Sequence, residues 1–187
     1  MSLMDVLIIL VPATLLYAAP LIFTALGGVF SERSGVINIG LEGLMVMGAF
    51  TSIVFNLTFD DVFGAATPWV SILAAMIVGV LFSLLHGVAA ISLRADQTVS
   101  GVAINLLAVG VTLFLVKLMY GKAQTDAIQE TFNKINIPYL SDIPIIGDIF
   151  FSNTYYTSFV AIIVAAIVWF VIKKKSWAQL LAMFKKK

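Results

Sequence analysis

The sequence predicts an all-α, polytopic membrane protein with about five transmembrane helices, and three observations lead to this fold class. Of the 187 residues, 61% are hydrophobic and only 11% are charged. The mean hydropathy is +1.07, and a soluble domain of this size has no core large enough to bury so much apolar surface. The apolar residues also fall into runs of about 20, the length that crosses a bilayer core as a helix.

Five apolar runs have this length, and the residues at their ends suit a membrane interface. The first contains Pro12 and Pro20, which a membrane helix tolerates when its neighbours satisfy the freed carbonyls. The third opens with Pro68 and Trp69, a helix-start proline beside an interfacial aromatic residue. Within a membrane region of residues 1–172, the predicted spans are 6–30, 36–57, 69–93, 99–120 and 155–172.

The positions of Lys and Arg orient these spans. Arg33 lies between the first two, Arg94 lies between the third and fourth, and six lysines follow the fifth. Because cytoplasmic loops hold the excess of positive charge, we expect the N-terminus outside the cell and the C-terminus in the cytoplasm. Residues 121–154 are then an extracytoplasmic segment, and residues 173–187 form a basic cytoplasmic tail.

The extracytoplasmic segment is too polar to cross the bilayer and too rich in Pro, Gly, Asn and Asp for one long helix. We expect a short amphipathic helix near Thr125 to Phe132. A loop should follow, with the apolar residues of Ile143 to Phe151 on the membrane surface. Two interpretations are open, an ordered connector or a docking surface for an external partner.

Composition and motifs exclude several classes of function. A net charge of +1 gives no electrostatic attraction to nucleic acid. The chain has no Cys, hence no disulfide, thiolate metal site or thiol nucleophile, and the single His86 cannot form a metal site by itself. Motifs for nucleophilic, metal-dependent or phosphate-binding chemistry are also missing from the sequence. We therefore predict no enzyme activity, no metal and no cofactor.

Polar residues within the apolar spans are the candidate functional residues. A charged side chain at the bilayer centre costs about 2.5 to 3.5 kcal/mol, so Glu42 should face protein or water. Asn38 is four residues earlier and should share its helix face. Glycines should let another helix backbone approach closely. The candidates for a transport path or gate are Asn38, Gly40, Glu42 and Gly43 in the second span, and Gln97, Gly101 and Asn105 in the fourth.

These groups, together with His86 on the third span, reach a comparable depth along their predicted helices. A polar cluster at one depth suits a translocation route or its inner gate, where hydrogen-bonding groups replace water around a polar solute. The alternative is helix packing, which single Asn and Gly residues in membrane helices serve more often. Packing is favoured for Asn105 and His86, whereas the two interpretations are balanced for Glu42.

Three stretches give the chain a family resemblance. They read ALGGVFSERSGVINIGLEGLMVMGAF from Ala25, RADQTVSGVAINLLAVGVTLFLVK from Arg94 and PYLSDIPIIGDIFF from Pro138. The chain resembles, from Leu3 to Ile172, the permease subunits of bacterial ABC importers for nucleosides and simple sugars, relatives of the ribose and branched-chain amino acid permeases. The residues that match the family motif are Gly35, Asn38, Gly40, Glu42 and Gly43.

This resemblance implies the N-terminal half of a larger ABC-importer permease fold. It also implies that the chain works in a bacterial cell membrane, among membrane lipids, as the permease for nucleosides or simple sugars. The implied partners are a second permease subunit, a substrate-binding lipoprotein and two cytoplasmic ATPase subunits that hydrolyse ATP. No nucleic acid is implied.

The family pattern ends at the lysine run that begins with Lys173. Family members continue with a loop that docks on the ATPase and with further spans, whereas here KKKSWAQLLAMFKKK follows. We therefore expect a C-terminally truncated permease that is not competent alone. Its tail is either out-of-frame sequence after a frameshift, the favoured interpretation, or a basic amphipathic segment on an anionic inner leaflet. A non-transporting membrane adaptor or regulatory subunit is the alternative function, and an independent ion or proton-coupled carrier is a third.

Overall fold

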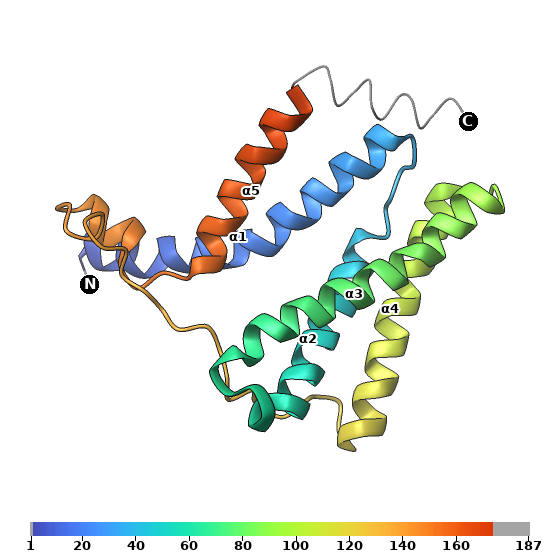
Figure 1. Cartoon of the computed structure of the whole chain (residues 1–187), viewed down its shortest axis with the longest axis horizontal. Helices are drawn as coiled ribbons and strands as arrows, with labels where there is room; N and C mark the ends of the chain where they lie inside the picture. Colours follow the sequence, from blue (N-terminus) through green and yellow to red (C-terminus); the bar gives the residue numbers. More distant parts are fainter. Residues whose placement is uncertain (1, 174–187) are drawn as a thin grey trace. The chain divides into compact units, whose positions relative to one another are not determined.

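A computed structural model describes residues 2–173 of the chain, so the predicted basic tail lies outside the described residues except for Lys173. The α-helices are α1 (Leu3–Ser34), α2 (Leu41–Phe63), α3 (Thr67–Gly87), α4 (Gln97–Tyr120) and α5 (Tyr156–Lys173). Three short elements are a 3-10 helix at Gly64–Ala66 and π-helical turns at Val88–Ser92 and Gly147–Phe151. Residues 2–173 contain no named strand, and the predicted all-α fold is confirmed (Figure 1).

The described residues fall into two compact units. Residues 27–131, which we call the hairpin unit, hold α2, α3 and α4. Residues 2–26 and 132–173, which we call the terminal unit, hold most of α1 and all of α5. All seven candidate residues from the sequence lie in the hairpin unit.

Four helical stretches of the described chain are long and apolar enough to cross a membrane. One of them, Leu41–Ser92, contains both α2 and α3. Five α-helices therefore stand where the sequence has five apolar runs. The helix α1 extends a few residues beyond the first run at each end and passes through Pro12 and Pro20 as one element.

The connection between α2 and α3 is much shorter than predicted. The second span was predicted to end at residue 57, but α2 continues to Phe63. Phe55, Phe59 and Phe63 follow one another on one helix face, with ring centroids 4.6 Å and then 6.3 Å apart. Such contacts between residues four apart stabilise the last turns of a helix. Only Gly64–Ala66 then separates the two helices, which pack as a hairpin (Figure 1).

The start of the second span also differs from the prediction. The sequence placed it at Val36, but residues 36–40 are not helical and α2 begins at Leu41. Gly35 has φ +90°, a conformation that glycine adopts without a steric penalty. The Asn38 side chain then accepts a hydrogen bond from the Gly40 N–H at 2.9 Å, in a local turn. The expectation that Asn38 and Glu42 share a helix face is therefore wrong.

The amphipathic helix predicted near Thr125 to Phe132 is absent as well. This stretch has no helical turn, and the Glu130 carbonyl accepts a hydrogen bond from the Asn56 side chain at 2.9 Å. An isolated helix of about eight residues is marginal because its nucleation is costly. The Glu130 carbonyl thus bonds to a side chain of α2 and not to a backbone N–H within its own segment.

Candidate functional site

The non-helical residues 35–40, which we call the linker, are held by side chains from two neighbouring helices. The Ile37 N–H donates to Gln97 Oε1 at 2.8 Å, in the first turn of α4. That turn is itself capped by Asp96, whose carboxylate accepts from the Val99 N–H at 2.9 Å. Gln97 thus stands on a fixed helix start, and it satisfies a backbone donor of the non-helical linker between α1 and α2.

Asn105 takes the place of a helical hydrogen bond. In a continuous helix the Gly43 N–H would pair with the Ile39 carbonyl, four residues earlier. Here the Gly43 N–H donates to Asn105 Oδ1 at 2.7 Å, and Asn105 Nδ2 donates to the Ile39 carbonyl at 3.1 Å. Each unsatisfied backbone group costs several kcal/mol in lipid. The side-chain amide of Asn105 therefore satisfies backbone groups at the start of α2 that have no helical partner.

Glycines let the two backbones meet at this point. A Cβ on Gly43 would lie 2.9 Å from both the Asn105 Cα and the Ile104 carbonyl oxygen. On α4, a Cβ on Gly101 would lie 2.9 Å from the Gly40 nitrogen. Both contacts are with backbone atoms, which cannot move aside as a side chain does. The start of α2 and the linker consequently lie directly against α4, as small residues at membrane helix contacts permit.

His86 connects α3 to the linker and to α4 through hydrogen bonds. Its side chain is 3% exposed, with Nε2 3.2 Å from the Ile37 carbonyl oxygen and Nδ1 3.0 Å from Ser100 Oγ. A carbonyl only accepts hydrogen bonds, so we assign the ring proton to Nε2. In the neutral ring, Nδ1 then accepts from the Ser100 hydroxyl. One side chain on α3 thereby joins the linker to α4.

Replacing His86 with Phe should lower the free energy of unfolding by about 1–2 kcal/mol, because the Ile37 carbonyl and the Ser100 hydroxyl both lose their partner. The matched control is Ser83→Ala, one turn earlier on α3, where the hydroxyl donates only to the Val80 carbonyl of the same helix. The stability of both variants is measured by thermal unfolding in detergent, monitored by circular dichroism. Equal melting temperatures for the two variants would contradict the assigned bonds.

The structure brings six of the seven predicted residues into one group, which we call the linker cluster. Its members are Asn38, Gly40, Gly43, Gln97, Gly101 and Asn105. Glu42 stands apart, because its side chain is exposed and makes no hydrogen bond or ion pair with residues 2–173. It lies in the first turn of α2, where the helix dipole favours an acidic group.

The sequence did not indicate that backbone groups of the linker are the hydrogen-bond partners of the polar side chains. Ile37 and Ile39 look like ordinary apolar span residues, yet their N–H and C=O groups are what Gln97, His86 and Asn105 bind. A signal was present, because an Asn-Ile-Gly sequence preceded by Gly35 contains the residues that form turns. The surrounding hydrophobicity favoured a continuous helix instead.

Comparison with known proteins identifies the family. Residues 10–177 match the family described as branched-chain amino acid transport system / permease component, and the chain belongs to this family. With its apolar helices, it is a multi-pass membrane protein. The resemblance inferred from the motifs is thereby confirmed.

The individual relatives are named as transporter permeases. The chain is 68% identical to the guanosine ABC transporter permease protein NupQ of Bacillus subtilis, over 93% of this chain and 54% of the relative. It is 49% identical to the nucleoside ABC transporter permease protein NupC of Lactococcus lactis, over 93% of this chain and 55% of the relative. The chain spans about half the length of these curated relatives. No solved structure matches it.

Proposed function

We propose that the chain is a membrane-spanning permease subunit of an ATP-driven importer for nucleosides. The observation that carries this proposal is the 68% identity to a guanosine permease over 93% of the chain. All six residues of the linker cluster, from Asn38 to Asn105, lie inside the family match. A nucleoside is neutral and rich in hydroxyl groups, so its carrier needs hydrogen-bonding groups that replace its water.

The linker cluster supports this role through its geometry. Many membrane transporters bind their substrates where a transmembrane helix is interrupted, because backbone groups and helix ends are available there. The linker, which connects α1 to α2, places the start of α2 at such a helix end, and Gln97, His86 and Asn105 hold it in a fixed position. The Glu42 carboxylate, exposed at the first turn of α2, is then the group that meets a solute hydroxyl or an opposing subunit.

The remaining parts of the importer are inferred from the family. A second permease subunit would complete the path, a substrate-binding lipoprotein would deliver the nucleoside, and two cytoplasmic ATPase subunits would hydrolyse ATP. The chain itself would carry out no catalysis. The positions of Arg33 and Arg94 support an N-terminus outside the cell, with the lysines that follow α5 in the cytoplasm.

The proposal is tested by grafting this chain into a full-length relative. The segment of the B. subtilis guanosine permease that aligns over 174 residues is replaced by the corresponding residues of this chain, in cells without their own guanosine permease. Uptake of radiolabelled guanosine is then measured with and without an energy source. Energy-dependent uptake by the chimera is the expected result, and its absence at normal membrane levels of the chimera would contradict the proposal.

In the same chimera, Glu42→Gln should reduce uptake by about tenfold, the effect of losing one hydrogen bond to a charged group. The amount of protein in the membrane should not change, since Glu42 has no partner within residues 2–173 that the fold needs. Asp61→Asn, near the other end of α2, is the matched control and should leave uptake unchanged. A non-transporting adaptor predicts no effect of either change, so unaltered uptake in the Glu42 variant would favour that alternative.

A further inference from the structure

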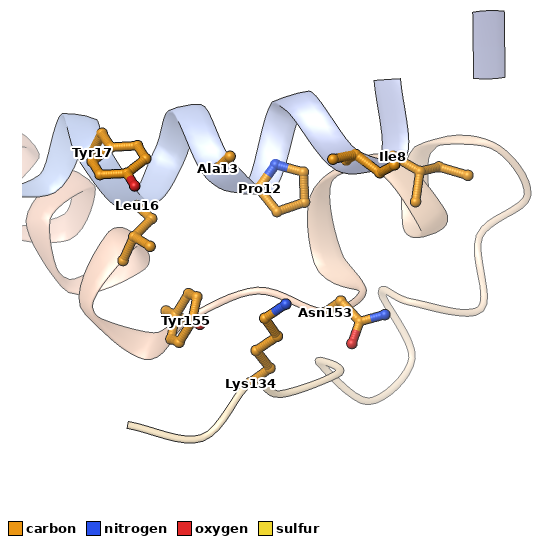
Figure 2. Close-up of a pocket in the computed structure, with 9 residues that line it drawn as sticks. Ile8, Pro12, Ala13, Leu16, Tyr17, Lys134, Asn153 and Tyr155 are labelled. Atoms are coloured by element: carbon orange, nitrogen blue, oxygen red, sulfur yellow. The ribbon is translucent and has the colours of Figure 1, made fainter. Parts of the chain in front are cut away.

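The terminal unit contains a groove of about 390 Å³ that has no residue in common with the linker cluster. One wall is a mainly aliphatic face of α1, which includes Ile9, Ala13 and Leu16 and has Tyr17 at one end. The opposite wall is polar and comes from the segment that precedes α5. It includes Lys134, Asn153 and Tyr155 (Figure 2). The groove is therefore apolar along a membrane-length helix and polar on the facing side.

Backbone bonds hold the polar wall together. Ile135 and Thr154 form an antiparallel bridge, with N–H to carbonyl distances of 2.8 Å and 3.1 Å. This bridge sets Lys134 beside Asn153 although the two are 19 residues apart in the sequence. The Asn153 N–H also donates to Asn136 Oδ1 at 2.8 Å. The backbone that carries Lys134 and Asn153 is thus held by hydrogen bonds within the protein.

The groove presents the positive charge of Lys134, and no acidic residue among residues 2–173 lines it. The Lys134 ammonium forms no ion pair with residues 2–173, whereas Lys122 in the same segment pairs with Asp126. The segment holds four acidic residues, yet none of them lines the groove. In Figure 2 the Lys134 side chain extends between Tyr155 and Asn153 toward α1. An anion that enters here would meet an ammonium, an amide and a phenol.

We propose that this groove binds an anionic phospholipid, with the phosphate at Lys134 and an acyl chain on the aliphatic face of α1. A lysine and a tyrosine beside an apolar helix are the groups that proteins place at the headgroup level of a bilayer. A free phosphate would use the ammonium but not the aliphatic wall. The combination of both walls therefore favours a lipid, in which charge and chain are linked.

The experiment compares lipids that remain bound to the purified full chain by native mass spectrometry. The probes are phosphatidylglycerol and phosphatidylcholine with identical acyl chains, and glycerol 3-phosphate serves as the chain-free anion. The ratio of bound phosphatidylglycerol to bound phosphatidylcholine is expected to fall about fivefold in Lys134→Ala. This is the effect expected for the loss of one lysine at a membrane surface. Lys122→Ala is the matched control, and Lys134→Arg should keep the preference.

A second variant tests the apolar wall. Ala13→Phe fills the groove from α1 while Lys134 stays in place, and it should lower phosphatidylglycerol retention without loss of helix content by circular dichroism. Equal effects of Lys134→Ala and Lys122→Ala would overturn the proposal, because the attraction would then come from overall charge. So would binding of glycerol 3-phosphate as tight as that of the lipid. Guanosine uptake plays no part in these readouts, so the outcome is independent of the proposed transport function.

Discussion

Replacing Gly43 with alanine is expected to destabilise the protein by about 1–3 kcal/mol, the usual cost of overpacking a tight contact. The new methyl group would lie 2.9 Å from the Asn105 Cα and from the Ile104 carbonyl oxygen, so α2 and α4 must move apart. The same movement would stretch the bond from the Gly43 N–H to Asn105 Oδ1. One methyl group would thus weaken both the packing and the hydrogen bonding of the linker cluster.

Gly48 on the same helix supplies the control, because no atom of residues 2–173 outside its own stretch of helix lies within 4 Å of its Cβ position. Gly48→Ala should be neutral or stabilise the helix by up to about 1 kcal/mol, as alanine favours helix over glycine. The helix α4 allows the same comparison, with Gly101→Ala as the damaging change and Gly110→Ala as the harmless one. Thermal unfolding in detergent gives the change in stability of all four variants. Melting temperatures that do not separate within each pair would show that the backbones do not meet as described.

Replacing Asn105 with leucine should cost about 2–4 kcal/mol, because the Gly43 N–H and the Ile39 carbonyl both lose a partner at once. Asn105→Asp keeps an acceptor for the Gly43 N–H but has no donor for Ile39, so an intermediate loss is expected. Thr112→Val is the control on the same helix. Its buried hydroxyl donates only to carbonyls of α4 itself, Ala108 among them.

The Asn105 variants are measured by thermal unfolding and by the helix content of the folded state. A loss no larger than that of Thr112→Val, together with unchanged helix content, would mean that the Asn105 bonds contribute nothing. A gain in helix content would mean that α2 extends backward once the amide is removed. The start of α2 at Leu41 would then depend on Asn105 rather than on Gly35 and the turn at Asn38.

The sequence predicts the helices well where hydrophobicity alone decides them. The run at 155–172 becomes α5, Tyr156–Lys173, and Pro68 stands in the first turn of α3 as a helix-start proline. Prediction fails where one local interaction outweighs the average hydrophobicity of the surrounding sequence. The ring contacts of Phe59 with Phe55 and Phe63 extend α2 to Phe63, whereas the sequence predicted that this span ends at residue 57.

The residue types of the candidate site could be predicted from the sequence, but their hydrogen-bond partners could not. Polar and small residues at one depth on three spans did identify the place where α2, α3 and α4 meet. What the sequence does not specify is that Gln97, His86 and Asn105 bind main-chain atoms of Ile37, Ile39 and Gly43. A side chain that satisfies a distant backbone group leaves no periodic pattern, and such partners emerge only from the three-dimensional arrangement.

The central structural claim is that the Asn105 side chain, and not the Ile39 carbonyl, holds the Gly43 N–H. Hydrogen exchange of the Gly43 amide, resolved by NMR in the protein and in Asn105→Ala, tests this most directly. The Leu44 amide is the internal control, since its N–H donates to the Gly40 carbonyl in the helix at 3.1 Å. We predict that the Asn105 variant loses protection at Gly43 by at least about tenfold, while Leu44 changes little. Full protection of Gly43 in the variant would mean that α2 begins earlier, with residues 36–43 in an ordinary helix, and the linker as described would have to be abandoned.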